Sequence, residues 1–238
     1  MLSKKILSAS QTSGGGGGGG VGADGNIAFV GSAVFELSSY QSNSTQPYFS
    51  FGSSAISGVQ SGDLLLVMCA DDLSVNPPDD PGNGWTQFDH RYGFAGSSSM
   101  YGAYKTATSS DTSFSIDTVY YSTGAIPSAV MLAFRNASFD EAADSSGGDR
   151  DDPPSMSTST GDATVIVLYY QDDNSEASIS NVPAAYTEAA SAFSYASSNA
   201  SSGVIAWYNL SPSNPENVGD LYGAYADMAA QTIVLNNS

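Results

Sequence analysis

Two stretches of the chain share one pattern of polar and apolar positions: a Gly-Asp pair, an unbroken apolar run and an acidic exit. The first begins at Gly62-Asp63 and the second at Gly161-Asp162. Each apolar run is too short for a lone amphipathic helix and lacks helical spacing, so it predicts a strand buried on both faces. The Gly-Asp pair predicts a tight turn at the start of each strand.

Further landmarks follow the two runs in the same order: an aromatic residue after a proline, then an aromatic strand. The separations are 161 − 62 = 99 for Gly62 and Gly161, 186 − 85 = 101 for Trp85 and Tyr186, and 207 − 104 = 103 for Tyr104 and Trp207. Because three landmarks recur at nearly one separation, the sequence predicts a degenerate internal duplication. The predicted halves span about 58–137 and 160–238, and the acidic stretch 140–159 is predicted to link them.

Other short apolar or alternating segments predict the remaining strands. These segments are 27–37, 48–51, 101–107, 112–119, 128–135 and 231–235. Residues 182–194 come nearest to helical periodicity and are interpreted as loop and strand. Since neither half can cover its own apolar face, we expect one all-β domain over 26–238, a two-sheet antiparallel β-sandwich of jelly-roll type.

The composition supports a large β domain and restricts its partners. The chain has 238 residues, 41% of them hydrophobic, and a formal net charge of −18 with six basic residues. This charge would repel nucleic acid and anionic lipid, so neither nucleic acid nor a membrane is expected as a partner. Cys69 is the one cysteine, so no intrachain disulfide forms and packing has to stabilise the fold.

The N-terminal region, residues 1–25, differs from the predicted domain. Its first 13 residues carry two positive charges and an apolar patch too short for the core of a signal peptide. Seven consecutive glycines follow, a composition typical of flexible linkers. We expect either an anchoring arm or a terminus without structure of its own. The residues through which an arm would bind are Lys4, Lys5, Ile6 and Leu7.

Signatures of catalysis are weak. A Ser-His-Asp triad would depend on His90, the one histidine, and no G-x-S-x-G turn is present. Burial of Cys69 would raise its pKa and block access, which argues against cysteine chemistry. The 24 acidic residues could always supply a glycosidase pair, so their number carries no signal. A non-enzymatic protein without a cofactor is expected.

Acidic and aromatic residues suggest two weaker ligand hypotheses. Acidic pairs follow both apolar runs, so related halves would bring them to one end of the sandwich, either as a Ca²⁺ site or as a solvated acidic rim. These residues are Asp71, Asp72, Asp172 and Asp173. Aromatic residues of the first half form either a sugar-stacking platform or a cover for the core. They are Trp85, Tyr92, Tyr101 and Tyr104.

A series of motifs resembles β-sandwich virion proteins of tailed bacteriophages. The motifs are Ser61-Gly62-Asp63-Leu64-Leu65-Leu66-Val67, Gly84-Trp85-Thr86, Tyr101-Gly102-Ala103-Tyr104-Lys105 and Ala129-Val130-Met131-Leu132-Ala133-Phe134-Arg135. The resemblance covers about 58–238 and is closest over 61–137. The opening Lys4-Lys5 segment with its glycine tract is similar to the N-termini of phage tail and fibre proteins.

The resemblance implies a non-enzymatic structural or adsorption protein, assembled in the host cytoplasm and exposed on the virion. A tail fibre or tip component is favoured over a capsid decoration, cement or head-fibre protein. Other virion proteins would bind the N-terminal arm, a homo-oligomer such as a trimer is expected, and a host-surface glycan is a further candidate ligand. A Ca²⁺-dependent carbohydrate-binding module is the remaining alternative.

Overall fold

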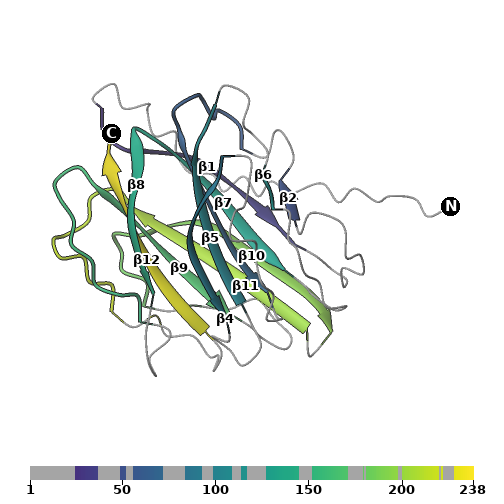
Figure 1. The fold of residues 1–238 in the computed structure, drawn as a ribbon. Helices are drawn as coiled ribbons and strands as arrows, with labels where there is room; N and C mark the ends of the chain where they lie inside the picture. Colours follow the sequence, from purple (N-terminus) through teal and green to yellow (C-terminus); the bar gives the residue numbers. More distant parts are fainter. Residues whose placement is uncertain are drawn as a thin grey trace.

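Strands account for all the regular secondary structure in the part of the chain that the structure describes. The computed structural model describes twelve strands and no helix within residues 25–36, 49–51, 56–71, 84–92, 99–108, 114–116, 127–144, 152–170, 179, 181–197, 200–219, 221 and 228–238 (Figure 1). None of these residues forms a helix long and apolar enough to cross a membrane.

Two five-stranded antiparallel sheets pack face to face. The first has the order β1 (Ala28–Phe35), β7 (Ser128–Arg135), β3 (Leu64–Asp71), β5 (Ser99–Thr106) and β4 (Thr86–Tyr92). The second has the order β10 (Thr187–Ser197), β11 (Ala200–Asn209), β9 (Ala163–Tyr170), β12 (Met228–Asn237) and β8 (Ala137–Asp144). A small sheet pairs β2 (Phe49–Phe51) with β6 (Phe114–Ile116). The predicted all-β, two-sheet antiparallel sandwich is confirmed.

The chain completes one sheet before it begins the other. The first sheet contains β1, β3, β4, β5 and β7, and the second contains β8 to β12. In a jelly roll the chain passes repeatedly between the two sheets, so the sandwich is as predicted but its strand order is not that of a jelly roll. Figure 1 shows the green-to-yellow strands β9 to β12 lying side by side, with the darker β4 and β5 crossing over them in this view. Packing between the two sheets is therefore packing between the two halves of the chain.

Both faces of the central strands are buried. Alternate residues point to opposite faces of a strand, so β3 directs Leu64, Leu66 and Met68 into the core between the sheets, and β9 directs Val165 and Val167 there. The intervening residues face outward and are covered by segments outside the sheets. These covers include Ile56, Val59 and Trp85 on the first sheet and Tyr186, Val218 and Leu221 on the second.

The strand order confirms the predicted duplication. If β1, β3, β4, β5 and β7 correspond to β8, β9, β10, β11 and β12, the order β1-β7-β3-β5-β4 becomes β8-β12-β9-β11-β10, which is the order of the second sheet. The first half therefore includes β1 and the second includes β8, so both halves extend beyond the predicted 58–137 and 160–238. Each half supplies one complete sheet with the same internal connectivity.

Two β-bulges recur at corresponding positions. In the β4–β5 pair the register shifts between Gln87 and Asp89, and in the β10–β11 pair it shifts between Glu188 and Ala190. The pairs β1–β7 and β8–β12 also share a bulge, which follows Phe29 in β1 and Phe139 in β8. Because a bulge changes which face the following side chains occupy, its repetition keeps the two halves in matching registers.

The turn before each central strand also recurs. Gly62 has φ of 96° and Gly161 has φ of 94°, values that an L side chain rarely adopts. The next residue in each case, Asp63 or Asp162, accepts a hydrogen bond through its carboxylate from the backbone N–H three positions earlier, at 2.7 Å and 2.5 Å. The Gly-Asp pair predicted to form a tight turn does so in both halves.

Two aromatic pairs join the sheets and are equivalent to each other. Phe29 of β1 stacks on Tyr208 of β11 with ring centroids 4.5 Å apart, and Phe139 of β8 stacks on Tyr104 of β5 at 4.3 Å. The registers of the strand pairs make Phe29 equivalent to Phe139 and Tyr208 equivalent to Tyr104. The two halves therefore interlock through a pseudo-twofold arrangement.

Two sequence-based expectations need correction. Tyr104 corresponds to Tyr208, not to Trp207, because Tyr104 pairs with Leu66 and Tyr208 pairs with the equivalent Val165. The predicted linker 140–159 begins inside β8, which is the equivalent of β1. β8 is an edge strand with a bulge at Asp140, so its polar residues and broken alternation resemble a loop in sequence.

Both central strands begin at the same end of the sandwich. Asn136 lies at this end, between the last residue of β7 and the first residue of β8. The end of β7 pairs with the start of β3, so the turn before Leu64 lies beside Asn136. The start of β8 pairs with the end of β12, which pairs with the start of β9, so the turn before Ala163 lies there too. We call it the proximal end; the opposite, distal end is where β3 and β9 finish, at Asp71 and Tyr170. Both central strands therefore finish at one end, but of the acidic residues expected there the described residues include Asp71 alone.

Candidate functional site

A polar cluster with two buried and two half-buried side chains closes the side of the sandwich where the edge strands β4 and β8 meet. Gln231 of β12 is fully buried, and its Nε2 donates hydrogen bonds to Asp89 Oδ2 at 2.7 Å and to Asp144 Oδ1 at 2.8 Å. Its Oε1 accepts a hydrogen bond from the hydroxyl of Tyr169, also fully buried, at 2.9 Å. We call Tyr169, Gln231, Asp89 and Asp144 the seam cluster.

The seam cluster joins the two halves of the chain. Asp89 comes from the first half, on β4, and the other three residues come from the second. Burial raises the pKa of the Tyr169 hydroxyl, and the negative charges of Asp89 and Asp144 raise it further. Tyr169 is therefore held as a neutral donor, and it satisfies the Gln231 oxygen inside the core.

The pseudo-twofold arrangement places an apolar counterpart of the seam cluster on the other side of the sandwich. By strand register the positions equivalent to Tyr169, Gln231, Asp89 and Asp144 are Ala70, Val130, Ala190 and Val34. All four belong to or pack against the apolar core. At these equivalent positions the other side of the sandwich is apolar, so the seam cluster occurs on one side alone.

A second polar network holds the cover on the outer face of the second sheet. Glu216 is buried, and its carboxylate accepts hydrogen bonds from the Ser213 N–H and hydroxyl, both at 2.7 Å, and from Asn209 Nδ2 at 3.2 Å. Burial acts to raise the pKa of Glu216, but hydrogen bonds from Ser213, Tyr186 and Asn209 together outweigh it and lower the pKa. Tyr186 also exchanges a hydrogen bond with Thr164 Oγ1 at 2.8 Å.

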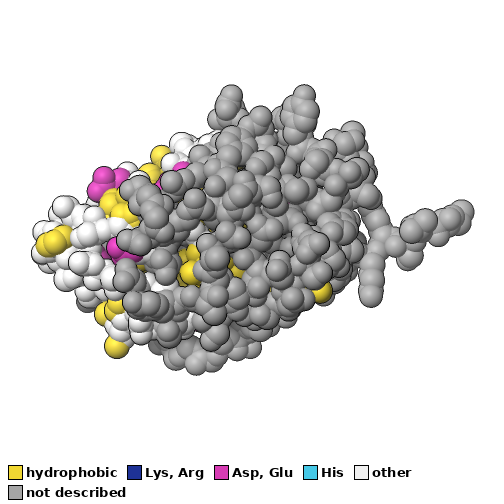
Figure 2. All heavy atoms as spheres, turned by 90° about the horizontal axis from the view of Figure 1, so that it is seen from below, with side chains coloured by type: hydrophobic (Ala, Val, Ile, Leu, Met, Phe, Trp, Pro, Cys, Tyr) yellow, Lys and Arg dark blue, Asp and Glu magenta, His cyan; other side chains and the backbone are white. Residues whose placement is uncertain are grey.

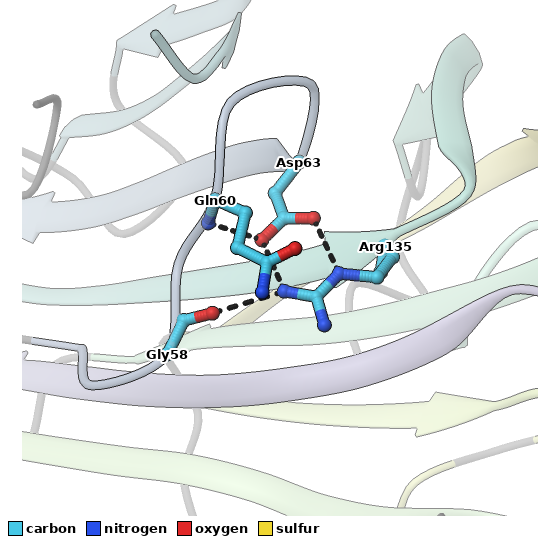
Figure 3. Close-up of polar contacts among 4 residues, drawn as sticks. All are labelled: Gly58, Gln60, Asp63 and Arg135. Atoms are coloured by element: carbon cyan, nitrogen blue, oxygen red, sulfur yellow. Dashed lines mark hydrogen bonds and ion pairs between the residues drawn. The ribbon is translucent and has the colours of Figure 1, made fainter. Parts of the chain in front are cut away.

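An ion pair fixes the turn before β3 (Figure 3). Arg135 Nε and Nη2 each donate to one carboxylate oxygen of Asp63 at 2.9 Å, and Nη2 also donates to the Gly58 carbonyl at 2.9 Å. The hydrogen bond to Asp63 raises the pKa of Arg135 despite its partial burial. At the equivalent position the second half has Asn236, so this ion pair belongs to the first half alone.

The aromatic residues predicted as a sugar platform do not form one surface. Trp85 and Tyr101 are each 5% exposed and lie in the outer cluster of the first sheet, whereas Tyr104 faces the opposite side, into the space between the sheets. The platform is therefore wrong for these three residues, and the alternative of a cover for the core holds for Trp85. The side chain of Tyr92 lies outside the described residues.

The predicted Ca²⁺ ligands are only partly within the described residues. Asp71 is buried at the last position of β3, and Asp72, Asp172 and Asp173 lie outside the described residues. Within the described ranges, no three His, Cys, Asp or Glu side chains are grouped so that they could hold a metal ion. The arm residues Lys4, Lys5, Ile6 and Leu7 also lie outside the described residues.

Cys69 is buried, as the sequence predicts. Burial raises the pKa of its thiol, which keeps it protonated. The side chain of His90, the other residue considered for catalysis, lies outside the described residues.

The start, the midpoint and the end of the domain are tied together at the proximal end. Asn136 Nδ2 donates to the Asn26 carbonyl at 3.0 Å, and the Asn136 carbonyl accepts a hydrogen bond from the Ser238 N–H at 3.1 Å. Asn26 and Ser238 therefore both lie at the proximal end of the sandwich.

The visible surface in Figure 2 mixes charged and neutral side chains. Among the described residues on this face, acidic side chains (magenta) lie beside hydrophobic and uncharged polar ones, and no basic side chain is visible. This agrees with the acidic composition of the chain.

No family model, curated protein or solved structure matches the chain.

Proposed function

We propose that this chain is a non-enzymatic structural protein of a tailed bacteriophage particle, exposed on the particle and attached through its N-terminal segment. Within this proposal a tail fibre or tip component is favoured over a capsid decoration, cement or head-fibre protein. The family resemblance of the motifs in the first half suggests the class of protein, and the geometry of the domain suggests how it would be held.

The observation that carries the proposal is the junction at Asn136. Because this residue binds both Asn26 and Ser238, the domain is entered and left at the proximal end. A leading segment bound to a larger assembly would then hold the sandwich by that end. The distal end, with the β4–β5 and β10–β11 connections, would face away from the attachment.

The polar clusters of the described domain support a structural role. Asp63, Glu216 and Gln231 each use their side chains in hydrogen bonds within the protein, and these bonds fix a turn, a loop and the seam between the sheets. Such groups stabilise the folded state instead of presenting reactive atoms to a substrate. A stable sandwich with an acidic surface suits a module displayed in solution.

Deletion of residues 1–20 tests the proposal. The shortened protein should remain folded and soluble, because the described domain begins at residue 25, but it should no longer join the particle. A matched control exchanges the seven glycines for a Gly-Ser linker of the same length, which should preserve incorporation because flexibility and reach are kept. Incorporation of the deletion variant at the level of the full chain would contradict the proposal.

Imaging of particles that carry a labelled version of the chain then assigns its location. Label on the tail supports the favoured fibre or tip role, and label spread over the head supports decoration of the capsid. A full-length chain that is absent from particles altogether contradicts both.

A further inference from the structure

The two halves of the chain are joined by a single residue, although they share one apolar core with residues from both sheets. β7 ends at Arg135, β8 begins at Ala137, and Asn136 between them has φ of 55°. Among the described strands, each five-stranded sheet draws all its members from one half. Separation of the halves would therefore disrupt packing between the sheets but no strand pairing within either sheet.

The corner at Asn136 depends on a left-handed backbone conformation. Asparagine adopts this conformation more readily than most residues other than glycine. With Asn136 in an extended conformation instead, β7 and β8 would run on as one strand, and the second sheet would point away from the first. The packing between the sheets, including the Phe29–Tyr208 and Phe139–Tyr104 stacks, could then form with a second copy of the chain.

We propose that two copies of this chain exchange halves through Asn136 and form a dimer of two complete sandwiches. In this dimer the first sheet of one copy packs on the second sheet of the other. The interface is the inner face already present in the single chain, so it needs no new complementary surface.

The seam cluster determines which halves can pair. It is complete only when Asp89 of a first half meets Gln231 of a second half. Two second halves would place Ala190 where Asp89 belongs, and two first halves would place Asp89 beside Val130 in an apolar core. Two first halves would leave Asp89 without the Gln231 amide, and two second halves would remove one of the two hydrogen bonds that Gln231 Nε2 donates, so the cluster favours the pairing of a first half with a second.

Two substitutions at Asn136 test the role of the corner. Asn136→Gly and Asn136→Val both remove the hydrogen bond to Asn26, but glycine tolerates the left-handed conformation and β-branched valine does not. After refolding at high protein concentration, size-exclusion chromatography with light scattering should give a dimer-to-monomer ratio at least about tenfold higher for the valine variant. Equal ratios for the two variants would overturn the proposal.

Complementation between two defective chains tests the exchange itself. Leu66→Asp and Val165→Asp place a charge at equivalent inner positions, the first in β3 and the second in β9, so each chain has one intact half. Each variant refolded alone should give little folded protein. When they are refolded together, the intact halves should combine into one sandwich in a species with the mass of a dimer, seen by circular dichroism and light scattering. A mixture with no more folded protein than the two separate samples would refute the exchange.

Discussion

The two sides of the sandwich are related by the same pseudo-twofold arrangement, yet one is polar and the other apolar. Tyr169, Gln231, Asp89 and Asp144 lie on one side, and Ala70, Val130, Ala190 and Val34 occupy the equivalent positions on the other. Strand order, bulges and the Gly-Asp turns are the same in both halves. Backbone geometry therefore defines this fold, whereas the polar cluster distinguishes one half from the other.

The largest expected effect comes from removal of the amide at the centre of the seam cluster. Gln231→Val introduces the residue found at the equivalent position, but it leaves the Tyr169 hydroxyl and two carboxylates without their partner. Because the Tyr169 hydroxyl is fully buried and the two carboxylates are half-buried, we expect a loss of about 3 kcal/mol in the free energy of unfolding, measured in urea.

The matched control converts the whole cluster to an apolar one. Combining Gln231→Val with Tyr169→Phe, Asp89→Ala and Asp144→Val removes donors and acceptors together, so most of that stability should return. If the combined variant is less stable than Gln231→Val alone, the seam cluster contributes through packing and our account of it is wrong.

The two inter-sheet aromatic pairs should contribute equally. Phe29→Ala and Phe139→Ala each remove a ring that stacks on a tyrosine of the opposite sheet. Each should lower the free energy of unfolding by about 2–3 kcal/mol, because both rings are partly buried. Thermal and urea unfolding of the two variants provide the measurement, and losses that differ by more than about twofold would count against equivalence of the pairs.

Glu216 marks a difference between the outer faces and makes stability depend on pH. Its pKa is lowered in the folded protein, so its contribution is present above the ordinary pKa of a glutamate and is lost as pH falls through the folded value. Glu216→Gln should lower stability by about 1–2 kcal/mol at neutral pH. It should also reduce the further loss between pH 6 and pH 3, measured by urea unfolding at each pH; an unchanged pH profile would contradict this assignment.

The ion pair at the turn of the first half should have the smallest effect. Arg135→Asn introduces the residue that the second half carries at the equivalent position, and it should destabilise the protein by about 1 kcal/mol, because the arginine is partly exposed. Asn236→Ala is the matched change in the second half and should alter stability by less than about 0.5 kcal/mol. Equal effects would show that the turns are held in the same way.

Local pattern was enough to predict much of the fold. The unbroken apolar runs gave both central strands, and β7 has the bounds predicted for it, 128–135. The duplication was also predicted from landmarks in the sequence. Tyr104 was matched to Trp207 and not to its structural equivalent Tyr208, because the connections between strands differ in length in the two halves. β8 was missed, since an acidic edge strand with a bulge lacks a clear alternation.

The candidate site was not predicted, for a physical reason. Asp89 and Gln231 are 142 residues apart, and only the pairing of the two sheets brings them together. One signal was available: Gln231 is a polar residue inside an apolar strand, a pattern that requires a buried partner. The predicted sugar platform is wrong because side chains alternate between the two faces of a strand. Tyr101 and Tyr104 are three positions apart, so they face opposite sides of the sheet.

Native-state hydrogen exchange tests most directly whether the two sheets form one cooperative unit in which neither is stable alone. We expect the backbone amides of β3 and β9 to exchange with the same free energy of opening, equal to that of global unfolding. If the amides of one central strand exchanged with a clearly lower free energy of opening than those of the other, the halves would unfold independently and the two sheets would not form one cooperative unit.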